Sequence, residues 1–331
     1  MTTDRVRRRE QRIRQLEQER DAREAAVFHR VPRLGEIKDI QGEIGLDLAR
    51  LVLHAKTRFG KDFEALKAWS QELSVERDAL LKQHAIDPAG LEVRWDCPHC
   101  KNTGWLPPEP AGPDTVRPSR KCQCLIQEEI DDLYKASGLT GPLREQQFNR
   151  FDLTVYPPDD RKYMARVLEY CKAYAARVAG GTQRESLLFA GDVGRGKTFL
   201  SSCIANAAVS AGRTVVYLTF SEFLDLLRLH RFDDDEEYRQ GIDRLLSADL
   251  IVLDDLGAEK VSEFVGQELF NIINHRMNRL MPMIVSTNLT AGEIEDAYGP
   301  RIASRLLNGF DGMELRGDDV RLVLKRRRSG V

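Results

Sequence analysis

The residues with the clearest chemistry lie in one run of eight, Gly191-Asp192-Val193-Gly194-Arg195-Gly196-Lys197-Thr198. The run matches the pattern G-x-x-x-x-G-K-[ST], in which backbone N–H groups close around phosphates. Lys197 would reach the β- and γ-phosphates of a nucleoside triphosphate, and the Thr198 hydroxyl would hold Mg²⁺. We therefore predict that this run and the following residue, Phe199, bind ATP and magnesium. The alternative is a chance glycine-rich turn.

Two carboxylates form the second candidate group. Asp254 and Asp255 follow four apolar residues, 250–253, which predict a buried strand. Open α/β sheets bind ligands at the carboxyl ends of their strands. We predict that Asp254 holds Mg²⁺ through its water shell and that Asp255 orients a water molecule for attack on the γ-phosphate. The competing interpretation is a pair of helix-capping aspartates.

Two further candidates lie later in the chain. Asn288 ends the apolar run 283–288, and an amide at that strand tip can hydrogen-bond the γ-phosphate or the attacking water; a plain turn residue is the alternative. Arg301 and Arg305 are four residues apart and so share one helical face. They are either part of a solvated surface or a pair that reaches the γ-phosphate bound to a neighbouring subunit. In the second case the protein must self-associate to be active.

The elements that must position these residues alternate between strand and helix. We expect strands at 186–190, 214–220, 250–255 and 283–288, a possible fifth strand at 320–325, and helices at 161–179 and 199–210. Near-continuous apolar runs are typical of buried parallel strands, and alternation with helices favours a sheet covered on both faces. The sequence therefore predicts an α/β fold with a phosphate-binding loop between the first strand and its helix.

A cysteine-rich segment precedes this domain. Cys97 and Cys100 are spaced C-x-x-C, and Cys122 and Cys124 follow a proline-rich loop with the tighter spacing C-x-C. Two cysteine pairs that flank a loop suit a tetrahedral, structural zinc site with no open position for water. Free thiols are the alternative. Cys171 and Cys203 stand in apolar helical settings and are predicted to be core thiols.

The N-terminal region is charged and helical in pattern. Apolar residues recur at intervals of three and four over 37–55 and again over 63–80. Such helices pack either on one another as a hairpin or on a partner. The arginine-rich segment before Pro32 has a weaker apolar stripe and is predicted to be a solvated or partly disordered arm. We divide the chain into a helical region, 1–90, a zinc-binding module with a helix, 91–137, a linker, 138–160, and a nucleotide domain, 161–331.

Composition limits the classes of protein that the chain can represent. The chain has 331 residues and a formal net charge of −2, so overall charge says nothing about a nucleic-acid partner, and any basic surface must be local. No apolar run reaches the length of a membrane span, and the basic N-terminus lacks the apolar segment of a secretory signal. We expect a cytoplasmic protein with reduced thiols and no membrane partner.

Taken together, residues 145–325 resemble the core of an AAA+ ATPase, and residues 35–325 resemble the bacterial replicative helicase loaders of the DnaC and DnaI type. The resemblance rests on the cysteine segment 97–124, the run Phe148-Asn149-Arg150-Phe151, the phosphate loop, the run Asp254-Asp255-Leu256-Gly257-Ala258-Glu259, the run Ser286-Thr287-Asn288, and Arg301 to Arg305. The phosphate loop is common to many NTPases. The aspartate run and the cysteine segment before a short core are more specific.

The resemblance implies roles for individual residues. Asp254 would be the Walker B metal residue, Asp255 would stand where the catalytic acid stands, and Asn288 would be sensor 1. Arg305 fits the arginine finger, with Arg301 beside it. Residues 148–151 would lie on the adenine side. Two features depart from the wider AAA+ pattern. Asp255 replaces the usual glutamate, which suggests slow hydrolysis, and the short segment after Arg305 leaves little room for a C-terminal lid.

The resemblance also implies partners. The N-terminal helical and zinc region would dock on a hexameric DnaB-type helicase, and the ATPase domain would self-associate as an open spiral that holds single-stranded DNA. Arg228 and Arg231 are candidate DNA contacts on the helix after the second strand, although an acidic run follows them directly. The basic C-terminal run, 325–328, is either a second phosphate-binding segment or a solubilising tail.

Three functions fit these features. The first is an ATP-dependent loader of a replicative helicase onto single-stranded DNA. The second is a transposition helper ATPase of the IstB kind, which shares the core and the aspartate run but serves a transposase. The third is a nucleotide-binding adaptor with negligible hydrolysis. The cysteine segment and the long helical N-terminus favour the loader.

Overall fold

A computed structural model describes all residues except 1, 54, 107–118, 230–234, 258–260 and 330–331. The chain forms two compact units, residues 1–126 and 127–331. Each unit is described by itself below. The four-part division predicted above is finer than these two units and stays a prediction. Among the described residues, no helix combines the length and the apolar character needed to cross a membrane.

The first unit is built around a helical hairpin. Helix α2 (Pro32–Val52) and helix α3 (Phe63–Gln83) bury Ile37, Ile44, Leu66 and Leu73 against each other. Asp62 caps α3 by accepting a hydrogen bond from the backbone N–H of Ala65 at 2.8 Å. The intramolecular hairpin, one of the two packings expected for these stripes, is therefore formed.

The arginine-rich N-terminal segment is a helix, α1 (Thr2–Arg30), rather than a disordered arm. Its apolar stripe is sparse, but Leu16 is buried. Val27 and Phe28 also pack against the cluster that contains Val31 and Leu34, and three arginines add polar contacts. Arg12 pairs with Asp96 at 2.8 Å, and Arg9 donates to the Asn102 carbonyl in the cysteine segment. Arg23 donates to the carbonyls of Gly90, within the short 3₁₀ helix η1 (Pro88–Leu91), and of Glu92, just after it. The spacing of apolar residues does not reveal such long-range contacts, so the weak apolar stripe alone predicted a solvated or partly disordered arm.

The cysteine segment contains two short antiparallel strands, β1 (Trp105–Leu106) and β2 (Arg120–Lys121). Helix α4 (Gln123–Ser137) follows directly. The proline-rich loop between the strands lies outside the described residues.

The second unit is an α/β domain with a five-stranded sheet. Its parallel strands lie in the order β4-β5-β6-β3-β7. Their bounds are β3 (Ser186–Ala190), β4 (Val215–Thr219), β5 (Leu250–Leu256), β6 (Met283–Thr287) and β7 (Phe310–Glu314). The strand β6 thus lies between the strand that leads into the phosphate loop and the strand that carries the paired aspartates.

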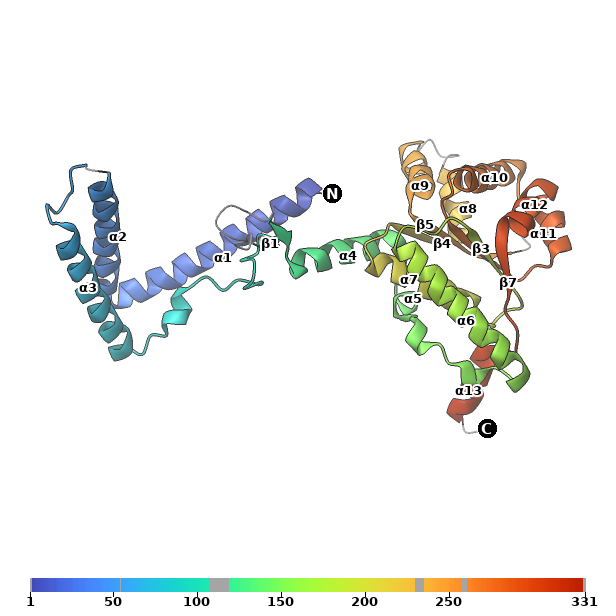
Figure 1. Ribbon diagram of the computed structural model, residues 1–331, viewed down its shortest axis with the longest axis horizontal. Coiled ribbons are helices and arrows are strands. Elements are labelled where there is room, and N and C mark those ends of the chain that lie inside the picture. The colour runs from blue at the N-terminus through green and yellow to red at the C-terminus, as the bar shows by residue number, and fades with distance from the viewer. Residues whose placement is uncertain (1, 54, 107–118, 230–234, 258–260, 330–331) are drawn as a thin grey trace. The chain divides into compact units, whose positions relative to one another are not determined.

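Helices cover both faces of this sheet (Figure 1). Leu187 and Phe189 of β3 pack on one face with α6 and α7, whereas Leu188 packs on the other face with α8 to α12. This alternation explains why the strands β3 to β6 are largely apolar. The helices are α5 (Pro142–Glu145), α6 (Pro158–Ala179), α7 (Lys197–Ser210), α8 (Phe220–Leu229), α9 (Asp235–Ser247), α10 (Glu263–Asn278), α11 (Ala291–Tyr298), α12 (Pro300–Gly309) and α13 (Val320–Ser329), with 3₁₀ helices η2 (Phe148–Arg150) and η3 (Leu153–Val155).

The domain has the α/β fold predicted from the sequence, with a parallel sheet flanked by helices, and Cys171 and Cys203 are buried as expected. The fifth strand was predicted wrongly. Residues 320–325 belong to helix α13, and the fifth strand is β7, which pairs with β3. A helix start signal is present before 320, because the Asp319 carboxylate accepts a hydrogen bond from the Arg321 N–H at 2.8 Å. Among the described residues after β7, Val320–Ser329 form α13.

Candidate nucleotide site and cysteine cluster

The phosphate loop joins β3 to α7, and its glycines are required by conformation and by close neighbours. Gly194 and Gly196 have φ values of 81° and 100°, which side-chain-bearing residues adopt rarely. A Cβ atom on Gly194 would lie 2.2 Å from the Asp319 carboxyl group, and one on Gly196 would lie 2.9 Å from the Tyr156 hydroxyl. The loop is therefore packed between α13 and the segment that precedes α6.

Lys197 is held inside the loop. Its Nζ atom donates to the backbone carbonyls of Gly191 at 2.5 Å and Asp192 at 2.9 Å. Burial lowers the pKa of Lys197, while the nearby carboxylates of Asp255, Asp254 and Asp192 oppose that shift. The lysine from the first motif and the two aspartates from the second thus act on one another at one site.

The two aspartates differ in exposure. Asp254 is 4% exposed, and Asp255 is exposed to solvent with a φ of 60°. Between Leu253 and Leu256 the pairing of β5 with β6 shifts register, so both aspartates lie in an irregularity of the strand. The irregularity turns Asp254 into the domain and Asp255 outward.

Asn288 follows β6 at the same edge of the sheet. Thr287 pairs with Ala190, the residue just before the phosphate loop, so Asn288 comes level with the start of that loop. Asn288 and Thr198 both have exposed side chains. The structure therefore brings the predicted phosphate, metal and water-orienting residues to the carboxyl ends of three neighbouring strands.

Arg301 and Arg305 lie on α12 and share one aromatic support. The guanidinium carbon of each is 4.2 Å from the ring centroid of Phe270 on α10. Arg305 also donates two hydrogen bonds to the Asn274 side-chain oxygen, the shorter at 2.9 Å. Among the described contacts, neither arginine has a carboxylate partner, so the pair presents positive charge that is held in place by neutral groups. Phe270 and Asn274 were not singled out from the sequence.

Aromatic rings line the start of α7. Phe151 stacks on Tyr156 and lies against Phe199, with centroid distances of 5.7 Å in both cases. The Tyr156 hydroxyl donates to the Arg195 carbonyl at 3.0 Å, which ties these rings to the phosphate loop. The rings provide an apolar wall of the kind that a nucleotide base contacts. Tyr156 was missed, although its place shortly after Phe148–Phe151 was a usable signal.

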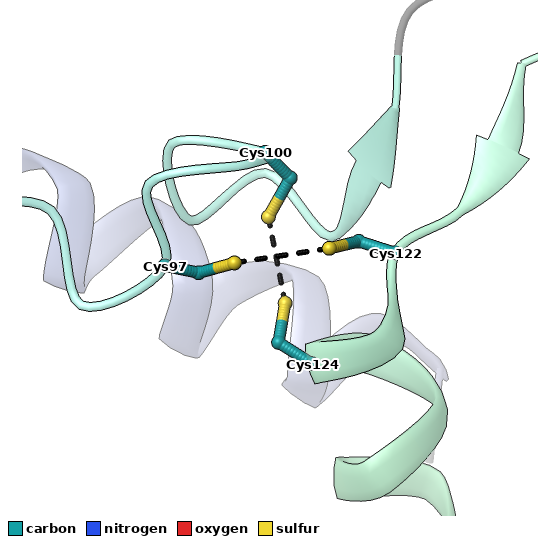
Figure 2. Close-up of side chains that lie close together, drawn as sticks. All are labelled: Cys97, Cys100, Cys122 and Cys124. Atoms are coloured by element: carbon teal, nitrogen blue, oxygen red, sulfur yellow. Dashed lines mark hydrogen bonds between the residues drawn. The ribbon is translucent and has the colours of Figure 1, made fainter.

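The four cysteines Cys97, Cys100, Cys122 and Cys124, here called the cysteine cluster, come together with their sulfur atoms within 4.8 Å of one another. Figure 2 shows Cys97 opposite Cys122 at 3.7 Å and Cys100 opposite Cys124 at 3.4 Å. Four sulfurs at about 2.3 Å from a tetrahedral zinc would lie about 3.8 Å apart. The donor set and its spacing fit zinc.

The surroundings of the cysteine cluster act in opposite directions on Cys97 and Cys124. Hydrogen bonds from the backbone, first that of Cys100, lower the pKa of the Cys97 thiol to about 6. The Gly104 N–H donates to Cys100 Sγ at 3.3 Å, and Arg9 of α1 donates to Cys124 Sγ at 3.7 Å. Burial raises the pKa of Cys124, an effect that a bound cation would reverse because it stabilises the thiolate.

The candidate DNA contacts have less support. Arg228 is exposed on α8 and pairs with Asp225 at 2.6 Å, while Arg231 lies outside the described residues. Of the C-terminal basic run, Arg327 donates to the Thr154 carbonyl at 2.7 Å and is thus engaged within the domain. Ala258 and Glu259 of the aspartate run also lie outside the described residues.

Part of the second unit is similar to a known protein family. Residues 175–327 match the family described as IstB-like ATP binding protein. The chain is 25% identical over 219 residues to the phage-like element PBSX protein XkdC of Bacillus subtilis, which covers 63% of this chain and 79% of that protein. It is 23% identical over 183 residues to the replicative helicase loader DnaI of Bacillus subtilis, covering 53% of this chain and 56% of DnaI.

Insertion-sequence proteins are similar as well. The putative ATP-binding protein of insertion sequence IS5376 from Geobacillus stearothermophilus is 26% identical over 202 residues, covering 60% of this chain and 75% of that protein. Among solved structures, the DnaC helicase loader is similar with a TM-score of 0.45 and 18% identity, over 54% of this chain and all of that one. Residues 175–327 of this protein are thus similar to the IstB-like ATP binding proteins.

Proposed function

We propose that this protein is an ATP-controlled loader that places a hexameric, DnaB-type replicative helicase onto single-stranded DNA. The observation that carries the proposal is the combination of an IstB/DnaC-like ATP-binding domain with a separate unit, residues 1–126, that holds a helical hairpin and the cysteine cluster. The similarity to a named helicase loader, DnaI, supports this assignment. The unit 1–126 would dock on the helicase, and the cytoplasmic location expected from the sequence belongs to the same proposal.

The nucleotide site supports slow, Mg²⁺-dependent ATP hydrolysis. Bound Mg²⁺ would neutralise negative charge on the phosphates. Lys197, with the backbone N–H groups of the loop, would bind the phosphates, and Thr198 with Asp254 would hold the metal. Asp255 and Asn288, both exposed at the strand ends, would orient the attacking water. Arg305, with Arg301 beside it, would contact the γ-phosphate of a neighbouring subunit in a self-associated assembly that holds single-stranded DNA.

The docking step is tested by co-migration of the full chain with the replicative helicase of the same organism, with ATP and Mg²⁺ and then without. The proposal predicts a complex that survives Lys197→Ala, because docking uses residues 1–126, and that weakens when the cysteine cluster is disrupted by Cys97→Ser with Cys122→Ser. If no complex forms under either condition, the loader is no longer the leading candidate.

A transposition helper is the second candidate, because the matching family is IstB-like and an insertion-sequence protein is among the relatives. It would bind a transposase rather than a helicase. Co-migration with the transposase encoded beside the gene would favour this function. A third candidate, an adaptor with negligible hydrolysis, is separated by turnover measured with and without single-stranded DNA, since an adaptor would show neither basal nor stimulated phosphate release.

The cysteine cluster would hold one structural zinc ion. Four thiolates leave no open coordination position, so the metal would stabilise the fold of the segment rather than catalyse a reaction. Elemental analysis of protein purified without chelator should give close to one zinc per chain, and Cys97→Ser with Cys122→Ser should remove it. Absence of zinc from the unsubstituted protein would contradict the assignment.

A further inference from the structure

Both carboxylate oxygens of Asp254 are engaged by hydroxyl groups from the neighbouring strands. The Tyr217 hydroxyl of β4 donates to Oδ2 at 2.9 Å, and the Ser286 hydroxyl of β6 donates to Oδ1. All three side chains are nearly inaccessible to solvent, at 4% for Asp254, 2% for Tyr217 and 1% for Ser286. A carboxylate buried this deeply needs hydrogen-bond donors, and the two hydroxyls supply one for each of its oxygens.

Ser286 has a second function in the same place. Its hydroxyl oxygen accepts a hydrogen bond from the Asp255 N–H at 2.9 Å. The Asp255 residue lies where the pairing of β5 with β6 shifts register, so its N–H lacks the regular ladder position. One hydroxyl thus fixes the backbone of Asp255 and the side chain of Asp254 together.

A purely architectural role does not account for these contacts. The backbone ladders already hold the strands, since Thr219 pairs with Asp254 across β4 and β5, and Leu253 pairs with Val285 across β5 and β6. The hydroxyls add orientation. An ionised carboxylate has about four lone-pair positions, so one donor on each oxygen leaves positions open for water molecules of a metal's hydration shell.

We infer that Tyr217 and Ser286 are positioning residues for the divalent cation at Asp254. They set the rotamer of the carboxylate, and through it the place of Mg²⁺ relative to Thr198. This inference rests on the ATP and magnesium site proposed above. Hydrogen-bond partners of metal-binding side chains typically affect metal affinity by about 10- to 100-fold when they are removed.

The test is the Mg²⁺ dependence of nucleotide binding by the full-length protein, measured with a fluorescent ATP analogue. Tyr217→Phe and Ser286→Ala each remove one hydroxyl and add no atoms. Each should raise the Mg²⁺ concentration at half-maximal effect by about 10- to 100-fold. Binding of the analogue in excess chelator should not change. Ser286→Thr keeps a hydroxyl and should restore most of the Mg²⁺ dependence.

Thr287→Val is the matched control. Thr287 is buried on the same strand, and its hydroxyl donates to the Leu256 carbonyl at 2.6 Å rather than to Asp254. It should lower thermal stability to a similar degree as Ser286→Ala without moving the Mg²⁺ dependence. The inference is overturned if both hydroxyl deletions show the Mg²⁺ dependence of the control. If the unsubstituted protein binds no nucleotide, the proposed ATP site fails instead, which is a different result.

Discussion

At the scale of single residues, the candidate site divides its groups by exposure. Lys197 and Asp254, the groups assigned to phosphate and metal, are 7% and 4% exposed and held by several partners. Thr198, Asp255 and Asn288 are exposed at the ends of the strands. A buried charged side chain that is held by several hydrogen bonds has few alternative positions, whereas an exposed side chain can adjust to its ligand. The arrangement suits a site in which the binding charges are fixed before the nucleotide arrives.

Replacing Lys197 by alanine should abolish most nucleotide binding. The ammonium group would make hydrogen bonds to phosphate oxygens, each contributing about 1.5–3 kcal/mol, so the affinity for ATP should fall by at least about 100-fold. Isothermal titration of the full chain measures this directly. Lys162→Ala, at an exposed position of α6, is the control and should bind as the unsubstituted protein does. Equal affinity of both variants would refute the site.

Removal of the arginine pair should separate hydrolysis from binding. A catalytic arginine that acts between subunits contributes about 10³- to 10⁵-fold in rate, so Arg305→Ala should lose DNA-stimulated turnover while keeping ATP affinity. Asn274→Ala, which deletes the oxygen that receives two hydrogen bonds from Arg305, should lower turnover by about 10- to 100-fold. Normal turnover in Arg305→Ala would assign the pair to a solvated surface.

Motifs pointed to the residues proposed to contact ligand, but not to the residues that support them. Gly191–Thr198 and Asp254 stand in contiguous patterns, and such patterns can be recognised without a structure. Tyr217 and Ser286 reach Asp254 from other strands, and Phe270 reaches the arginines from another helix. Their contacts depend on the order of strands in the sheet and on helix packing. No spacing in the sequence encodes that order.

At the scale of elements, β7 and α13 show where local pattern misleads. Phe310–Glu314 contains aspartate and glycine, which are poor strand formers, yet it pairs along β3 from Ser186 to Ala190. Residues 320–325 are rich in valine and leucine, like a strand, yet they form a helix that begins against the phosphate loop, where the Val320 N–H donates to the Gly194 carbonyl at 3.0 Å. Pairing with β3 makes residues 310–314 a strand, and the Asp319 cap starts the helix at residue 320.

The α2–α3 hairpin should lose stability in acid through Asp47. This buried carboxylate accepts hydrogen bonds from the N–H groups of Arg58 and Phe59 and from the Arg50 guanidinium, at 2.8–2.9 Å. Burial alone would raise its pKa, but the three hydrogen bonds outweigh burial and lower the pKa below its usual 3.8. The stabilisation is therefore complete above about pH 4 and is lost as the pH falls through the lowered pKa.

Tryptophan fluorescence can follow this loss, because all three tryptophans lie within residues 1–126 and Trp69 packs edge-on against Phe59 at 5.0 Å. The denaturation midpoint of the unsubstituted protein should fall between pH 4 and pH 2 more steeply than that of Asp47→Asn. Asp39→Asn, at an exposed position of α2, should behave as the unsubstituted protein. Parallel pH profiles for Asp47→Asn and the unsubstituted chain would contradict the assignment.

Metal removal should loosen α1. Arg9 donates to Cys124 Sγ and to the Asn102 carbonyl, and Arg12 pairs with Asp96, the residue before Cys97. A chelator that unfolds the cysteine segment would release both arginines. Trypsin should then cut within α1 at least several times faster, and cleavage within α6 should keep its rate. Unchanged cleavage of α1 after verified loss of zinc would show that the helix is held independently of the metal.

At the scale of the whole molecule, each of the two units has one proposed role. Residues 1–126 carry a hairpin and a cysteine cluster with no nucleotide motif, and residues 127–331 carry the complete candidate ATP site. In the proposed loader, ATP binding to the second unit would control the partner, while residues 1–126 would provide the docking surface. The same division would serve a transposase as partner, so the identity of the partner has to be decided by experiment.

The most direct measurement is the transfer of the replicative helicase onto closed circular single-stranded DNA, which a closed ring cannot enter unaided. The account predicts that helicase co-elutes with the circle when this protein and ATP are present. It also predicts that Lys197→Ala docks on the helicase but fails to complete ATP-dependent transfer. A helicase that loads equally well without this protein, or not at all in its presence, would contradict the loader assignment.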